Sequence, residues 1–167
     1  MARKLKVLII DYGLGNQSSV FNAVKKLGYN SLISCNQEEI LSADAYILPG
    51  VGAFGEAMSN IGRFGFIDTL KEQVLVKKKP LLGICLGMQI LAEDSQEGGF
   101  HKGLGWVKGH VISMAGDNDF KVPHVGWNDI KAIRESHLFL NMPATELNFY
   151  FDHSFYFSCE EENASST

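Results

Sequence analysis

The sequence predicts an α/β fold in which a mostly parallel β-sheet is flanked by helices. In the first half of the chain, short apolar runs alternate with amphipathic ones, which is the pattern of strands connected by helices. Three of the apolar runs end in unusual loops, DYGLGN, PGVGAFG and GICLG. In the second half, partial alternation with aromatic and turn residues indicates antiparallel strands.

The elements of the first half follow from periodicity and from helix-end signals. Apolar residues recur at helical spacing in residues 16–27 and 66–79, and Gly28 follows the first of these stretches as the expected residue after a helix end. Lysines at the end of the second stretch suit the helix dipole. We therefore expect strands at residues 6–11, 30–34, 45–50 and 80–84, and helices at residues 16–27, 37–42, 66–79 and 86–93.

The second half is expected to form antiparallel strands within residues 105–114, 120–133 and 147–157. In the first half, right-handed crossovers place helices on both faces of a parallel sheet. Such sheets gather functional groups at the carboxyl ends of their strands. The three unusual loops are therefore expected to lie close together.

Length and composition narrow the class of protein. A chain of 167 residues favours one domain with a sizeable core, and we expect residues 1–167 to form a single domain. The net charge of −4 argues against a nucleic-acid partner. The first apolar run, Val7 to Ile10, is too short for a signal peptide or a membrane span. The three cysteines have no CxxC spacing, which favours a reducing cytoplasm without disulfides or metal.

The stretch GICLG, residues 83–87, has the pattern of a nucleophile elbow with cysteine as the nucleophile. Gly83 and Gly87 carry no side chains that would crowd a sharp turn from strand to helix. The dipole of the following helix favours the reactive thiolate form of Cys85, and the amide of Leu86 can stabilise a developing oxyanion. The alternative is a small buried cysteine in a tight turn.

A second loop, PGVGAFG at residues 49–55, follows another buried strand. Its glycines let the backbone approach a ligand and present amide hydrogens to it. The alternative is a flexible connector, but a proline followed by spaced glycines at a strand end suits a backbone oxyanion donor better.

Taken together, these stretches resemble the class I (triad) glutamine amidotransferases. The resemblance is strongest to the HisH-type glutaminase subunits of imidazole glycerol phosphate synthase. It is carried in family order by IDYGLGNQSSV, LPGVGAFGEAM, LLGICLGMQILAEDSQEG, GLGWVKGHV, KVPHVGWNDI and FYFDHSFYF, spread over nearly the whole chain. The family's flavodoxin-like architecture agrees with the α/β pattern.

The resemblance implies that Cys85 attacks glutamine to form a thioester and that the ammonia passes to a synthase partner. It implies an oxyanion hole of backbone amides and a pocket for the amino-acid end of L-glutamine. The positions matched to these roles are Cys85 (nucleophile); Leu86, Val51 and Gly52 (oxyanion hole); and Gly50, Gly52, Gln89, Glu97, His153 and Ser154 (substrate). It also implies a heterodimer with a HisF-type cyclase barrel, with Gly13, Asn16 and Trp127 facing the partner. We expect no cofactor, metal or membrane association.

A cysteine nucleophile needs a histidine base that is held by a third group. In the family, this histidine and a glutamate lie in a His-Pro-Glu-type motif after the HS strand, and no such motif occurs in these 167 residues. Relative to the family, about thirty to forty C-terminal residues are missing, enough for two strands and a helix. His153 is the nearest match by sequence to the family's catalytic histidine, but it falls on the earlier HS motif. We therefore expect the domain to be C-terminally truncated and these 167 residues alone to be inactive.

Three other interpretations remain open at this point. The chain could be a paralogue that supplies ammonia to a sugar-modifying amidotransferase. It could be a non-catalytic binding subunit, as the missing triad residues suggest, although Cys85 and both loops argue for an enzyme. It could also be a cysteine hydrolase of another substrate, which the motifs outside the elbow make less favourable.

Overall fold

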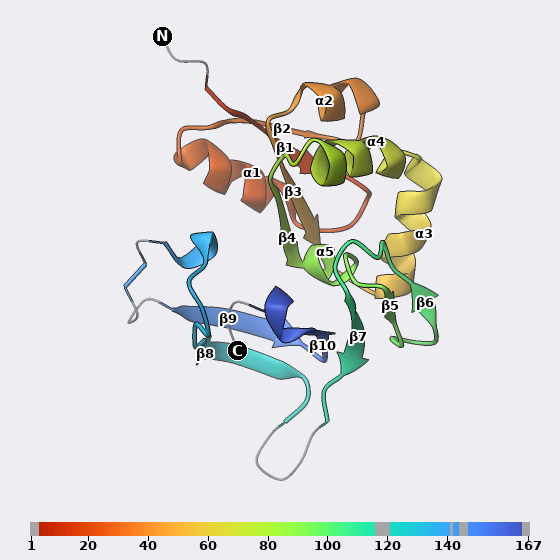
Figure 1. Cartoon of the computed structure of the whole chain (residues 1–167), viewed down its shortest axis with the longest axis vertical. Coiled ribbons are helices and arrows are strands. Elements are labelled where there is room, and N and C mark those ends of the chain that lie inside the picture. The colour runs from red at the N-terminus through yellow and green to blue at the C-terminus, as the bar shows by residue number, and fades with distance from the viewer. Residues whose placement is uncertain (1–3, 116–120, 141, 144–146, 165–167) are drawn as a thin grey trace.

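A computed structural model describes residues 4–115, 121–140, 142–143 and 147–164 of the chain (Figure 1). Strands and helices alternate in the first half, and strands dominate the second half. In chain order, the elements are β1 (Lys6–Ile10), α1 (Gln17–Lys26), β2 (Asn30–Ser34), α2 (Gln37–Ser42), β3 (Ala45–Gly50), α3 (Phe54–Phe64), α4 (Ile67–Lys71), a π-helical turn (Glu72–Val76), β4 (Leu81–Cys85), α5 (Leu86–Gln89), β5 (Asp94–Ser95), β6 (His101–Lys102), β7 (Gly109–Ser113), β8 (His124–Asp129), a 3₁₀ turn (His137–Phe139), β9 (Asn148–His153), β10 (Phe155–Cys159) and a 3₁₀ turn (Glu161–Asn163).

The first half forms a parallel sheet with strand order β2-β1-β3-β4. The chain moves one way across the sheet from β1 to β2 and the other way from β2 to β3. Because each crossover is right-handed, α1 lies on one face and α2 on the other, where it packs against α4. The predicted α/β class, with helices on both faces, is confirmed.

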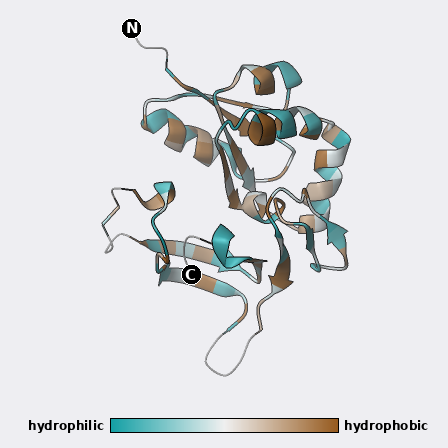
Figure 2. Cartoon of the chain, viewed as in Figure 1, coloured by the Kyte–Doolittle hydropathy of each residue, from teal (hydrophilic) through white to brown (hydrophobic). Residues whose placement is uncertain are grey.

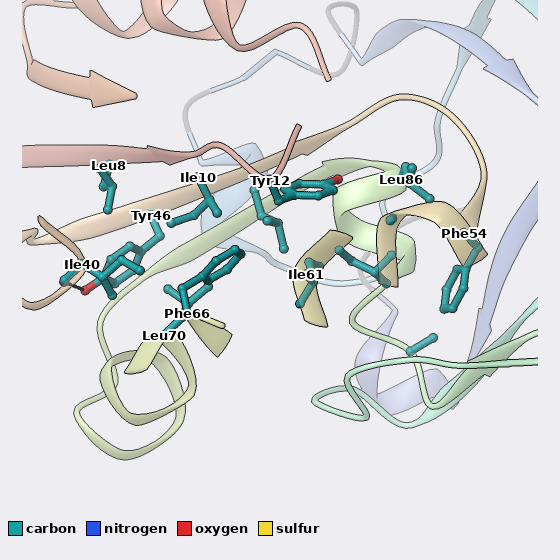
Figure 3. Close-up of a cluster of buried hydrophobic side chains, with 14 of the residues drawn as sticks. Leu8, Ile10, Tyr12, Ile40, Tyr46, Phe54, Ile61, Phe66, Leu70 and Leu86 are labelled. Carbon is teal, nitrogen blue, oxygen red and sulfur yellow. Dashed lines mark hydrogen bonds between the residues drawn. The ribbon is translucent and has the colours of Figure 1, made fainter. Parts of the chain in front are cut away.

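The core lies between the parallel sheet and its helices. Figure 2 shows hydrophobic residues running through the strands of this sheet, and Figure 3 shows their side chains packed with those of the helices. Leu8, Ile10 and Leu48 from the strands pack with Phe54 and Leu70 from the helices, all fully buried. β4 is different because it lies at the edge of the described sheet, which leaves its alternate apolar side chains exposed.

The second half forms two further sheets at the other end of the molecule (Figure 1). One has strand order β10-β7-β5-β6, and the other pairs β8 with β9 in antiparallel register. The prediction of antiparallel strands is correct except that β5 pairs parallel to β7. Residue 120, where the predicted stretch 120–133 begins, lies outside the described residues. No helix in the part of the chain that the structure describes is long and apolar enough to cross a membrane.

The sequence prediction missed α3, because residues 49–55 were interpreted only as a loop. The loop ends at Ala53, and the chain enters a helix at Phe54, which buries Phe54, Ala57 and Ile61 on one face. The predicted helix at 66–79 is also wrong in detail. It forms α4 only to Lys71 and then widens into a π-helical turn that ends at Val76.

The predicted helix at 86–93 is too long, since α5 ends at Gln89. After this turn, the carbonyls of Ile90, Leu91 and Ala92 accept hydrogen bonds from the amides of Leu104, Trp106 and Gly105, respectively. These long-range partners replace the bonds that would have continued the helix, and periodicity alone does not reveal them.

Candidate active site

Cys85 lies at the sharp turn between β4 and α5. Its backbone has φ 53° and ψ −120°, in a region that residues with side chains rarely adopt. Such a conformation costs on the order of 1–3 kcal/mol, and it persists where surrounding structure enforces it. The Cys85 side chain is exposed, as a nucleophile on an elbow must be. The elbow predicted from GICLG is therefore present.

The two glycines of the motif are required by close packing. A Cβ atom on Gly87 would lie 1.8 Å from the carbonyl oxygen of Leu48 on β3, and a Cβ atom on Gly83 would lie 2.6 Å from the Cα of Met88. No side chain fits at either distance, so only glycine lets the turn approach the neighbouring strand and its own helix.

A cavity of about 570 Å³ opens at Cys85, at the carboxyl ends of β3 and β4 and beside the first turn of α1. In an open α/β sheet, ligands bind at the carboxyl ends of the strands, at the point where the strand order reverses. In this sheet the order reverses between β1 and β3. The cavity contains every position matched to the nucleophile, the oxyanion hole and the substrate pocket: Gly50, Val51, Gly52, Cys85, Leu86, Gln89, Glu97, His153 and Ser154.

Hydrogen bonds on the carbonyl of Phe155 tie two walls of the cavity together. Gln89 Nε2, on α5, donates to this oxygen over 3.1 Å, and His153 Nδ1 donates to it over 2.9 Å. Gln89 therefore faces the cavity one helical turn after Cys85, as its spacing predicts. The same bond holds the 153–155 segment beside the elbow.

Glu97 forms another part of the wall. Its Oε2 accepts a hydrogen bond of 2.9 Å from the amide of Phe54, so it caps α3, whose N-cap residue Ala53 offers no side-chain acceptor. Its own amide donates to the hydroxyl of the buried Ser95. The half-buried carboxylate is thus fixed at the cavity wall.

His153 takes part in a hydrogen-bond network with Phe155 and His124. The carbonyl of Phe155 can only accept, so in the neutral ring Nδ1 of His153 carries the proton and Nε2 is an acceptor. His124 Nδ1 lies 3.0 Å from this Nε2 and donates to it, and His124 Nε2 lies 3.4 Å from the donor amide of Asn128. Both nitrogens of His153 are therefore engaged. Among the described residues, His153 is also the only histidine that lines the cavity.

The three residues predicted to face a partner lie in different settings. Asn16 caps α1 by accepting a hydrogen bond from the amide of Ser19, and it lines the cavity as well. Gly13 has φ +84° and its amide donates to Asp11. Trp127 lies on β8 outside the cavity, 72% exposed, with its ring edge-on to Tyr150, so it is not a core tryptophan.

Sequence reasoning missed two groups near the site. Tyr12 is fully buried, with its hydroxyl close to Gly50 and the elbow. It belongs to the DYGLGN loop, in which only Gly13 and Asn16 were predicted as site residues. No role was predicted for His124 from the sequence, yet its ring donates a hydrogen bond to His153. The sequence carries a weak indication that Tyr12 lies near the site, since Tyr12 directly follows a buried strand at the predicted functional edge. It carries no such indication for His124, because the pairing of His124 with His153 depends on the register of β8 and β9.

A family model described as "Glutamine amidotransferase class-I" matches residues 8–165 of the chain. The chain belongs to the class-I glutamine amidotransferases. Its resemblance to this family, first based on short motifs, is thereby confirmed over nearly its whole length.

Curated relatives place it further within the family. It is 45% identical over 160 residues to "Imidazole glycerol phosphate synthase subunit HisH 1" of Campylobacter jejuni, a match covering 96% of this chain and 79% of the relative. It is 46% identical over 164 residues to "Imidazole glycerol phosphate synthase subunit HisH 2" of Vibrio vulnificus, covering 98% of this chain and 76% of the relative.

Solved structures agree in fold. A crystal structure of a glutamine amidotransferase matches with a TM-score of 0.69 at 16% identity, covering 95% of this chain and 78% of that one. A glutamine amidotransferase from Thermotoga maritima matches with a TM-score of 0.57 at 17% identity, covering 95% of this chain and 64% of that one.

Proposed function

We propose that this chain is the glutaminase subunit of an imidazole glycerol phosphate synthase, acting in histidine biosynthesis. The observation that carries the proposal is an exposed cysteine on a strained elbow, facing a cavity at the carboxyl edge of the sheet. Relatives that are 45% and 46% identical over nearly all of this chain carry the name of that subunit.

The chemistry begins at Cys85. Its sulfur attacks the side-chain amide carbon of glutamine, forming a C–S bond and placing negative charge on the amide oxygen. The amides of Leu86 and of Val51 or Gly52, which meet at the cavity, stabilise this oxyanion. The C–N bond then breaks, and ammonia leaves with the proton that the thiol gave up. Water hydrolyses the thioester to glutamate and returns the thiol.

The amino-acid end of glutamine binds at another part of the cavity wall. The fixed carboxylate of Glu97 attracts the substrate ammonium, while Gln89 and the His153-Ser154 backbone offer polar contacts to the rest of that end. Because Gln89 and His153 share the Phe155 carbonyl, the contacts are held in one geometry before substrate arrives.

The base is not assigned to any histidine of these 167 residues. Among the described histidines, His153 alone lines the cavity, but its Nδ1 donates to a carbonyl and its Nε2 accepts from His124. It has no lone pair directed at a thiol proton. We keep the family's His-Glu pair as the required base and propose that these residues alone do not complete the triad.

The proposed partner is a HisF-type cyclase barrel, which takes up the ammonia in a heterodimer, and the proposed compartment is the cytoplasm. The proposed partner face lies at the carboxyl edge of the parallel sheet. It includes the Gly13 loop, Asn16 and the exposed Trp127 of β8. A large exposed aromatic side chain on a strand is a common anchor of protein interfaces.

Replacing Trp127 with alanine is expected to weaken binding to the cognate cyclase barrel by at least about tenfold, the effect of losing a hot-spot aromatic. The dissociation constant is measured by titration calorimetry. The matched control is Leu27→Ala, since Leu27 is 74% exposed at the far end of α1, and its loss leaves the affinity unchanged.

Trp127 is a better position for this test than Gly13 or Asn16. Substitution of Gly13 strains a left-handed backbone, and substitution of Asn16 removes a helix cap. If Trp127→Ala and Leu27→Ala both bind as tightly as the unaltered chain, the interface lies elsewhere.

A further inference from the structure

Tyr12 follows β1 and ends beneath the nucleophile elbow. Its side chain is fully buried, and its hydroxyl has no hydrogen-bond partner among the described residues. Figure 3 shows the hydroxyl oxygen directed toward Leu86, the first residue of α5. A buried hydroxyl without a partner is destabilising, so its presence at this place calls for a reason.

The hydroxyl lies where the two candidate oxyanion loops meet. A Cβ atom built on Gly50 would be 2.5 Å from the Tyr12 oxygen, 2.7 Å from the amide nitrogen of Gly87 and 2.8 Å from the Cβ of Leu86. Tyr12 therefore fills the space between the end of β3 and the turn that carries Cys85. Because no acceptor among the described residues holds its proton, the O–H bond is free to rotate toward a charge that forms nearby.

The hydroxyl also remains a donor whenever such a charge forms. Burial, followed by the negative charge of Cys85, raises the pKa of Tyr12 well above its ordinary value. The phenol is thus neutral throughout the pH range in which a thiol loses its proton. The two groups are near enough for the charge of one to act on the other.

The dipole of the helix after Cys85 stabilises a thiolate less than the sequence predicted. The helix after Cys85 has only the residues Leu86–Gln89, about one turn, so few peptide dipoles are aligned toward the sulfur. So short a helix leaves room for a nearby donor, such as the Tyr12 hydroxyl, to contribute to stabilising negative charge at the elbow.

We propose that Tyr12 is a positioning residue for the nucleophile, whose unpartnered hydroxyl turns its dipole toward Cys85 and stabilises the thiolate. The proposal rests on Cys85 being the nucleophile of the proposed function. It explains why a polar group is kept unpaired here: its partner, the anion, exists only when the site is ready to react.

The test compares Tyr12→Phe with Tyr46→Phe in the otherwise unaltered chain. Tyr46 is the matched control because it is equally buried and burial raises its pKa to about 12, but its hydroxyl donates to the carbonyl of Ile40 over 2.6 Å at the other end of the core (Figure 3). The rate of Cys85 alkylation by iodoacetamide is followed by mass spectrometry from pH 6 to about pH 10, spanning the ionisation of a cysteine thiol. Urea unfolding of each variant is measured alongside.

Tyr12→Phe is expected to slow alkylation about fivefold at neutral pH and to move the pH profile upward, with the same limiting rate at high pH. Its unfolding midpoint does not fall, because no hydrogen bond is lost. Tyr46→Phe lowers the unfolding midpoint and leaves alkylation unchanged.

Equal alkylation of Tyr12→Phe and the unaltered chain at every pH overturns the proposal. So does a slowing that is the same at every pH, since that indicates a change in access rather than in charge. The assay uses neither glutamine nor a synthase, so a failure of the glutaminase assignment is seen separately, as a lack of capture of glutamine analogues.

Discussion

The 167-residue chain, mixed with glutamine, is expected to release glutamate no faster than its Cys85→Ala variant. Losing the base of a nucleophilic triad costs about 10⁴–10⁶-fold in kcat, enough to remove detectable turnover. His153 is the histidine at the cavity, and its two nitrogens are occupied by Phe155 and His124. The measurement is enzyme-coupled detection of glutamate, with and without the cyclase partner.

The same assay has a positive arm. A chain extended by a strand bearing a His-x-Glu motif, as the family resemblance implies, should regain turnover that depends on Cys85. If the 167-residue chain already exceeds Cys85→Ala, one of its own histidines is the base. Loss of that turnover in His153→Asn would then identify His153, which would have to leave His124 during the reaction.

Replacing Gly87 with alanine is expected to lower the free energy of unfolding by about 3 kcal/mol or more, the upper range for overpacking a rigid site. The new Cβ atom would lie 1.8 Å from the carbonyl oxygen of Leu48, which β3 holds in place. The strand or the elbow must move, and alkylation of Cys85 changes with it. Urea unfolding followed by circular dichroism measures the effect.

Gly62→Ala is the control for this substitution. Gly62 lies within α3, has no atom within 4 Å of its added Cβ and does not require a positive φ. Alanine there should leave stability unchanged or raise it by up to about 1 kcal/mol. If both variants unfold at the same urea concentration, the close approach of Gly87 to Leu48 is not a constraint on the fold.

The sequence predicted the parallel half of the fold well because its elements are locally encoded. Strands and helices there follow from periodicity, and Gly28 marks a helix end by its left-handed backbone. Where prediction was wrong, distant contacts decide the structure. α5 stops at Gln89 because residues 104–106 take the next carbonyls, and α3 begins inside a stretch whose glycines indicate a loop.

The candidate site likewise has features that were predictable from local sequence and features that depend on distant contacts. The elbow at Cys85 and the glycine-rich loop after β3 were predictable, since each is encoded in consecutive residues. The capping of α3 by Glu97 and the pairing of His124 with His153 join residues 43 and 29 positions apart. Tyr12 was not predictable as a neighbour of Cys85 because their proximity comes from the packing of β1 against β3 and of β3 against β4.

The central claim is that Cys85 is a nucleophile for glutamine, and covalent capture by a chloroketone analogue of glutamine tests it most directly. In this reaction, the carbon–sulfur bond forms as chloride leaves, so no triad base is required. We predict a single adduct, mapped by peptide mass spectrometry to Cys85, whose formation is slowed by excess L-glutamine and is absent in Cys85→Ser. Adducts on Cys35 or Cys159 at a comparable rate, or labelling of Cys85 that glutamine does not slow, would contradict the account.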